Sequence, residues 1–222
     1  MPPFLGVILD VDGTLVDSND AHARAWCDAF AEQGLAVEYT KVRRLIGMGS
    51  DQLLPEAADI QRESELGSRL AERRGEVFTQ RYLAGVAAFP QTRALVERLR
   101  DQGLKLVVAS SAKASELEPL LQRAQVADLL PMRTSSGDVE HSKPAPDAVQ
   151  AALESCHLPA TAAVMIGDTP YDIAAATQAG VDVIAFRCGG WGDADLAGAI
   201  AIYDDPADLL ANYHASPLAV TG

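Results

Sequence analysis

Short apolar runs and segments of helical periodicity alternate over most of the chain. Four runs rich in aliphatic residues predict buried strands, at residues 4–9, 104–109, 162–166 and 181–186. Apolar residues recur at helical spacing in four segments between or before these runs, at 91–102, 113–123, 146–156 and 170–179. A short strand and helix follow around residues 200–210. Because strands and helices alternate, the pattern predicts a parallel sheet with helices on both faces.

The stretch from residue 16 to residue 86 has a different pattern. After Ser18, a candidate N-cap, apolar residues recur at helical spacing until Gly34, and further helical pattern continues to about Gly85. We find no convincing strand within it. The sequence therefore predicts an α/β fold with a Rossmann-like core of residues 1–15 and 87–222, and an inserted all-helical domain of residues 16–86.

Polar residues follow three of the predicted strands, and one more polar loop precedes the third of them. In open parallel sheets ligands gather beyond the carboxyl ends of the strands, so these loops are expected to meet at one edge. The four polar stretches are Asp10-Val11-Asp12-Gly13-Thr14, Ser110-Ser111, His141-Ser142-Lys143-Pro144 and Gly167-Asp168-Thr169-Pro170-Tyr171-Asp172.

Several carboxylates at one sheet edge predict a bound cation. Without one, the carboxylates of Asp10, Asp12 and Asp168 would repel one another and raise each other's pKa values. Mg²⁺ takes hard oxygen ligands and is typically held by one or two carboxylates together with a substrate phosphate. The four His and three Cys residues form no metal-ligand pattern, so zinc is not expected. We predict Mg²⁺ as the cofactor.

These residue types suit phosphoryl transfer. Asp10, at a rigid strand end, is the predicted nucleophile, and an aspartyl-phosphate on it would divide one difficult displacement into two easier ones. Asp12 is the predicted general acid and base. Lys143 and Ser110 would donate to phosphate oxygens, and Gly13 would let the backbone approach the anion. The predicted phosphate-binding residues of these loops are Gly13, Thr14, Ser110, Ser111 and Lys143.

Each motif also has an ordinary structural interpretation. Ser110-Ser111 can be an N-cap, Lys143 a solvated loop charge, and Thr169 with Pro170 the start of a helix. Their order at successive strand ends favours a shared site.

The four stretches together resemble the motifs of the haloacid dehalogenase superfamily, in the branch of phosphoglycolate phosphatase and beta-phosphoglucomutase. The third motif extends from Lys143 through Asp147. The resemblance covers essentially the whole chain. It implies that Asp10 is the nucleophile and Asp12 the acid and base. It also implies magnesium ligands from the Asp10 side chain, the Asp12 backbone carbonyl and Asp168, with Asp172 in support.

By the same resemblance, residues 16–86 are a cap domain that closes over the site and selects the substrate. The residues from Asp20 to Trp26 and from Arg43 to Gly49 are similar to cap segments near the active site. His22 is a candidate substrate or hinge contact, with packing as the alternative. The other candidate substrate contacts are Arg43, Gly47 and Gly49, for which a solvated charge and a helix stop are the alternatives.

Composition and charge limit the kinds of partner that we expect for this protein. The net charge of −13 makes nucleic acid an improbable partner, and no apolar run is long enough to span a bilayer. Three widely spaced cysteines and the lack of a recognisable signal sequence favour the cytoplasm. We expect a small phosphorylated metabolite as the partner, and a monomer or weak homo-oligomer.

The predicted function is hydrolysis of a small phosphomonoester. A sugar phosphomutase of the beta-phosphoglucomutase type is an alternative, because hydrolysis or transfer depends on how well the closed cap excludes water. A phospho-acceptor signalling module is a further alternative, since receiver domains also combine clustered acids, a hydroxyl residue and a lysine. The first-strand position of Asp10 and the large helical insertion are not expected in such a module.

Overall fold

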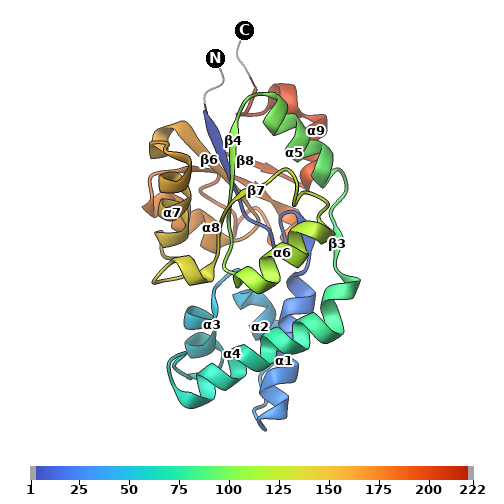
Figure 1. The fold of residues 1–222 in the computed structure, drawn as a ribbon, viewed down its shortest axis with the longest axis vertical. Coiled ribbons are helices and arrows are strands. Elements are labelled where there is room, and N and C mark those ends of the chain that lie inside the picture. Colours follow the sequence, from blue (N-terminus) through green and yellow to red (C-terminus); the bar gives the residue numbers. More distant parts are fainter. Residues whose placement is uncertain (1–3, 220–222) are drawn as a thin grey trace.

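A six-stranded parallel sheet forms the centre of the molecule in the computed structural model (Figure 1), which describes residues 4–219. The three residues at each end of the predicted core lie outside this range. The strand order is β5-β4-β1-β6-β7-β8. The strands are β1 (Gly6–Leu9), β4 (Lys105–Ala109), β5 (Met132–Thr134), β6 (Ala163–Gly167), β7 (Asp182–Phe186) and β8 (Ala201–Tyr203).

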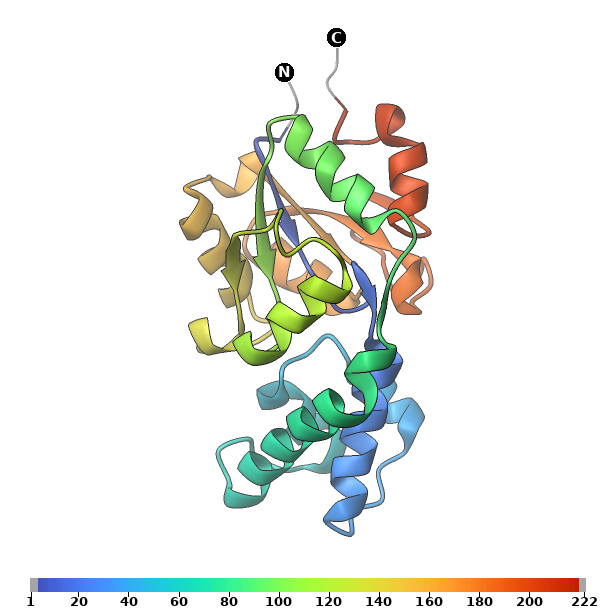
Figure 2. The ribbon, with the colours of Figure 1, turned by 45° about the vertical axis from the view of Figure 1, so that its right-hand side comes forward.

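Helices pack on both faces of this sheet, as predicted (Figures 1 and 2). Successive strand residues point to opposite faces, so Val7 and Leu9 join one buried cluster while Ile8 joins the other. The first cluster includes residues of α5 (Thr92–Asp101), α6 (Ala114–Arg123) and α9 (Pro206–Ala211), and the second includes residues of α7 (Asp147–Cys156) and α8 (Pro170–Gln178).

Two small features were missing from the sequence prediction. Strand β5 pairs with β4, but its three residues include Arg133 and form no apolar run. Arg133 donates instead to the carbonyl oxygens of Leu130, at 2.6 Å, and Ala127, at 2.8 Å. The second feature is a two-stranded antiparallel ribbon of β2 (Val16–Asp17) and β3 (Ala87–Ala88), which joins the two connections to the helical insertion.

The insertion is helical throughout, and we call residues 19–85 the helical segment. Its helices are α1 (Asn19–Glu32), α2 (Tyr39–Leu45), α3 (Ser50–Ala58) and α4 (Glu65–Val77), continued by a wider helical turn at Phe78–Tyr82 and a 3-10 turn at Leu83–Gly85. Other 3-10 turns are Ser136–Asp138, Ala160–Ala162, Arg187–Gly189 and Tyr213–Ala215. Among residues 4–219 no helix is long and apolar enough to cross a membrane.

The helical segment has its own apolar core. Trp26 and Phe30 of α1 stack at 5.6 Å between ring centroids and pack with Leu54 of α3 and Leu70 of α4. This cluster lies apart from the two that cover the sheet. In Figures 1 and 2 the segment lies at the end of the molecule opposite the termini.

Because the helical segment has its own core, truncating a side chain in that core should destabilise the protein. Leu54 is fully buried, whereas Leu5 at the start of the sheet is 52% exposed. We expect Leu54→Ala to lower the free energy of unfolding by about 2–5 kcal/mol, because it removes buried methyl groups and leaves a cavity. Leu5→Ala, the matched control, should change it by no more than about 0.5 kcal/mol. Urea denaturation monitored by circular dichroism measures both, and equal effects would contradict the assignment of Leu54 to a packed core.

Candidate active site

The motif residues meet at the carboxyl end of the sheet because β1 lies between β4 and β6. Asp10 follows β1, Ser110 follows β4 and Asp168 follows β6. The Asp10 N–H donates to the Ile166 carbonyl oxygen at 3.0 Å, which fixes the first acid against the neighbouring strand. Asp10, Ser110 and Asp168 are all buried.

Three buried carboxylates form one cluster around a lysine. Asp10, Asp168 and Asp172 each place an oxygen within 4.8 Å of the others. Lys143 Nζ lies 2.5 Å from Asp10 Oδ1 and 2.7 Å from Asp172 Oδ1. The Thr14 hydroxyl lies 3.0 Å from both Asp10 Oδ2 and Asp168 Oδ1, so it bridges these two acids.

The cluster holds more negative than positive charge. Burial raises the pKa of Asp10 to about 7, against the lowering effect of Lys143 and with a further rise from Asp172 and Asp12. Burial and the charges of Asp10 and Asp172 also raise the pKa of Asp168 well above its usual value. The pKa of Lys143 is raised, because its two carboxylate partners outweigh the effect of its burial.

This donor set fits a hard divalent cation. Oxygens of three carboxylates lie close enough to share one ion. An added positive charge would favour the ionised forms of Asp10 and Asp168, whose pKa values are raised first by burial and then by neighbouring carboxylates. Within the described range no histidine or cysteine belongs to this cluster. Oxygen-only ligands are those that Mg²⁺ prefers.

Asp172 also fixes the loop after β6. Its Oδ2 accepts the Thr169 N–H at 3.0 Å, and the Thr169 hydroxyl in turn accepts the Asp172 N–H at 3.1 Å. This reciprocal capping box begins α8 with Pro170 in the first turn. The interpretation of this loop as a helix start is therefore right, and Asp172 reaches Lys143 with its other oxygen.

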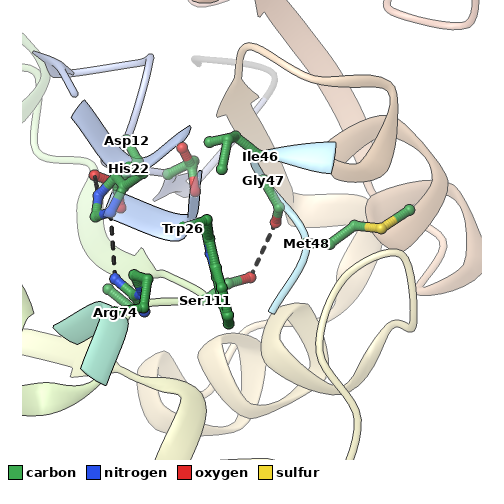
Figure 3. A pocket seen from close by; sticks show the side chains of 10 residues that line it. Asp12, His22, Trp26, Ile46, Gly47, Met48, Arg74 and Ser111 are labelled. Carbon is green, nitrogen blue, oxygen red and sulfur yellow. Dashed lines mark hydrogen bonds and ion pairs between the residues drawn. The ribbon is translucent and has the colours of Figure 1, made fainter. Parts of the chain in front are cut away.

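Asp12 points toward the helical segment rather than into the carboxylate cluster (Figure 3). Its Oδ1 accepts from Ser18 Oγ at 2.5 Å and lies 2.8 Å from His22 Nε2. Burial by itself would raise the pKa of Asp12, but the nearby His22, Ser18 and Arg74 together lower it. His22 stacks on Phe78 at 3.9 Å between ring centroids, so its ring is held in place. The packing interpretation of His22 therefore applies, and a substrate or hinge contact stays a prediction.

A small cavity of about 50 Å³ lies between the catalytic loops and the helical segment (Figure 3). The acids Asp10 and Asp12 line one side of it. The other residues that line it are His22, Trp26, Ile46, Gly47, Met48, Arg74, Ser111 and Ala112.

The structure changes the expected phosphate donors in the first loop. The Gly13 N–H donates to the Val16 carbonyl oxygen at 2.8 Å and the Thr14 N–H to that of Val11 at 3.3 Å, so both are used within the turn. The N–H groups of Gly13 and Thr14 are therefore not free to bind phosphate, so these two predicted phosphate-binding residues do not offer their backbone donors. Among residues 4–219 the N–H groups of Val11 and Asp12 take part in no such turn bond. These two N–H groups therefore replace those of Gly13 and Thr14 as candidate phosphate donors.

The second loop divides its two serines between different contacts. Ser110 Oγ accepts the Ala112 N–H at 3.0 Å, which leaves its own hydroxyl hydrogen available to donate. Ser111 Oγ donates to the Gly47 carbonyl oxygen at 3.1 Å and so ties β4 to the helical segment (Figure 3). Phosphate donation by Ser110 stays a prediction, whereas the Ser111 hydroxyl is already engaged.

Two predicted substrate contacts of the helical segment lie away from the cavity. Arg43 donates to the Gly189 carbonyl oxygen at 2.7 Å and to Asp20 Oδ1 at 2.7 Å. The Gly49 N–H donates to Ser142 Oγ at 3.0 Å. Both residues therefore hold the helical segment against the core, and of the two glycines only Gly47 lines the cavity.

Sequence reasoning missed two residues of the site. Asn19 Nδ2 donates to Asp168 Oδ2 at 3.0 Å and to the Gly189 carbonyl oxygen at 3.3 Å. The signal for Asn19 was its place one residue after the recognised cap Ser18. Arg74, in the cavity wall, is one of nine Lys or Arg residues in the insertion and carries no local signature.

Gly13 has a steric reason to be glycine. Its φ of 80° lies in the left-handed region, and a Cβ there would collide with the side chains of Asp168 and Asn19. The tight turn after Asp12 thus leaves room for the Asp168 side chain.

Comparison with known proteins agrees with this arrangement. The family model of haloacid dehalogenase-like hydrolases matches residues 7–186. A phosphoglycolate phosphatase of Rhodospirillum rubrum is 33% identical over 219 residues, which cover 91% of this chain and 88% of the relative. A hydrolase structure from Pseudomonas syringae superposes with a TM-score of 0.89 at 28% identity, covering 97% of this chain and 99% of that one.

A putative beta-phosphoglucomutase of Bacteroides vulgatus shares the fold, with a TM-score of 0.84 at 19% identity over 98% of this chain and 91% of the other. The resemblance that the four motifs suggested is thereby confirmed. The chain belongs to the haloacid dehalogenase-like hydrolase family.

Proposed function

We propose that the protein is a Mg²⁺-dependent phosphatase of small phosphorylated metabolites that works through an aspartyl-phosphate on Asp10. The observation that carries this proposal is the buried cluster of Asp10, Asp168, Asp172 and Lys143 beside a cavity that Asp12 also lines. Phosphoglycolate phosphatases among the relatives support hydrolysis and make 2-phosphoglycolate the first substrate to test.

The reaction has two displacements. In the first, an Asp10 carboxylate oxygen bonds to phosphorus as the bond from phosphorus to the ester oxygen breaks, and Asp12 gives a proton to the departing oxygen. In the second, Asp12 takes a proton from water, whose oxygen bonds to phosphorus and releases Asp10. The lowered pKa of Asp12 suits the second step, so we expect Asp12 to leave its His22 and Ser18 contacts before the first.

The cation and Lys143 neutralise charge around the phosphoryl group. Asp10 and Asp168 would hold Mg²⁺ with their carboxylates and Asp12 with its backbone carbonyl, while Asp172 supports the loop. When bound, Mg²⁺ supplies positive charge next to the phosphate oxygens. Lys143 adds a fixed ammonium, and Ser110 adds a hydroxyl donor. These groups are already held in place by strands and capping bonds, so little reorganisation accompanies the reaction.

We propose that the helical segment is a cap over this site, with domain limits near residues 16 and 86. Its residues line the cavity opposite Asp10, and Ser111 and Ser142 of the core bond to its backbone at Gly47 and Gly49. Closing such a cap excludes bulk water from the phosphoryl group. A cytoplasmic location and a monomeric or weakly associating state remain proposals, as does the exclusion of nucleic acid by the net charge of −13.

The nucleophile can be tested by one isosteric change. We expect Asp10→Asn to lower kcat for phosphate release by at least about 10⁴-fold, because the amide cannot attack phosphorus. The matched control is Asp17→Asn, an exposed acid seven residues further on, which should stay close to wild type. A malachite green assay with 2-phosphoglycolate and p-nitrophenyl phosphate measures both. Undiminished turnover in Asp10→Asn would exclude Asp10 as the nucleophile.

The metal site predicts a specific loss of Mg²⁺ affinity. EDTA should abolish phosphate release, and added Mg²⁺ should restore it. We expect Asp168→Asn to raise the Mg²⁺ concentration for half-maximal activity by at least roughly tenfold, the scale of effects seen for supporting residues of metal sites. Asp101→Asn, on the exposed end of α5, is the control. Full activity in EDTA would rule out the proposed cofactor.

The mutase alternative is tested with a single substrate. Incubation with beta-glucose 1-phosphate should yield free phosphate and no glucose 6-phosphate if the protein is a phosphatase. A coupled glucose 6-phosphate dehydrogenase assay detects the sugar product. Accumulation of glucose 6-phosphate in excess of free phosphate would instead support the mutase, whose fold the structural neighbours share.

A further inference from the structure

One buried arginine lies in the cavity wall formed by the helical segment. Arg74 of α4 is 8% exposed and lines the same cavity as Asp10 and Asp12. Its Nη1 lies 2.7 Å from Glu116 Oε2 of α6 and 3.3 Å from His22 Nδ1. The guanidinium carbon lies 5.4 Å from the centre of the Trp26 ring. These contacts hold the cation in one orientation at the cavity (Figure 3).

The hydrogen-bonding capacity of Arg74 is only partly used. The contacts with His22 and Glu116 are both made by Nη1, and the buried Nε has no hydrogen-bond partner among residues 4–219. A buried donor without a partner costs free energy, and a guanidinium suits a carboxylate because it donates along two parallel directions. The unused donor on Arg74 therefore points to an anionic group that is bound when substrate is present.

Arg74 is the only lysine or arginine among the described residues that line the cavity. Arg43 bonds to Gly189 and Asp20, and the guanidinium of Arg44 lies 4.1 Å from the Trp191 ring centre, outside the cavity. Lys143 is engaged by the catalytic carboxylates. A second negative charge on the substrate would therefore meet Arg74.

The position of Arg74 sets the length of the substrate. A single imidazole ring separates it from Asp12, since His22 contacts Arg74 through Nδ1 and Asp12 through Nε2. Asp12 is the group that protonates the ester oxygen in the proposed reaction. An anion at Arg74 thus lies only a short distance from that oxygen, and a cavity of about 50 Å³ suits a small molecule.

We propose that Arg74 is a specificity-determining residue that binds the carboxylate of a short phosphorylated hydroxy acid, and that Glu116 is the positioning residue that holds its guanidinium. This inference rests on the proposed phosphatase function and names the substrate class of the same site. The Arg74–Glu116 ion pair joins the helical segment to the core, so the carboxylate is bound where the two parts meet.

Matched substrates test the proposal. 2-Phosphoglycolate carries a carboxylate, ethyl phosphate has a methyl group in its place, and phosphoethanolamine carries a cation. We expect wild type to show a kcat/KM for 2-phosphoglycolate at least tenfold above that for each of the others, mainly through KM. In Arg74→Gln the ratio of 2-phosphoglycolate to ethyl phosphate should fall by roughly 10- to 100-fold, the scale for loss of hydrogen bonds to a charged group.

The ratio separates recognition from structural damage. Loss of the His22 contact can slow both substrates by a common factor, but that factor cancels in the ratio. Arg73→Gln is the matched control on the same helix, because Arg73 pairs with Glu32 and Glu76 on the outer surface. It should keep the wild-type ratio. Lysine keeps the positive charge but lacks the planar guanidinium group with its parallel donors. Arg74→Lys should therefore give an intermediate ratio.

Several results would overturn the proposal. They are equal losses for both substrates in Arg74→Gln, a changed ratio in Arg73→Gln of the same size, or wild-type enzyme without preference for the carboxylate. The wild-type comparison tests the substrate class even if the Arg74 variants do not fold. Phosphate release from ethyl phosphate without a carboxylate preference would refute this inference alone, whereas no release from any ester with Mg²⁺ would refute the proposed phosphatase itself.

Discussion

The site depends on a buried ammonium held between two carboxylates. Lys143 contacts both Asp10 and Asp172, and Asp168 adds a third acid at the same sheet edge. Burial raises the pKa values of Asp10 and Asp168, and neighbouring carboxylates raise them further, because one lysine does not balance three acids. The proposed cation would offset this excess of negative charge. Asp10 would then be ionised at neutral pH and able to act as the proposed nucleophile.

Secondary structure holds these charges in place. The parallel sheet sets Asp10, Ser110 and Asp168 on adjacent strands, and the capping box of Thr169 and Asp172 begins α8 in the same loop. A capping residue thus also anchors the lysine, which explains why a standard helix start and a catalytic loop coincide. Gly13 completes the arrangement, because a larger residue would displace Asp168.

The helical segment reaches the chemistry through contacts between its own side chains and the core. His22 contacts Asp12, and Arg74 contacts both His22 and, in the core, Glu116. A series of side-chain contacts therefore links the packing of α4 against the core to the carboxylate that we propose as the general acid and base. Closure of the segment and readiness of Asp12 are expected to be coupled, because they share these contacts.

The sequence by itself determined the α/β class, the place of the insertion and the identity of the core acids and lysine. Each of these lies next to an apolar run or in a turn, so local periodicity reveals it. Only the tertiary structure decided which backbone N–H groups remain available and that Arg43 holds the helical segment to Gly189. It also revealed Asn19 and Arg74 at the site. These facts depend on the packing of the helical segment against the sheet, and contacts between residues so distant in sequence leave no periodic or spacing signal along the chain.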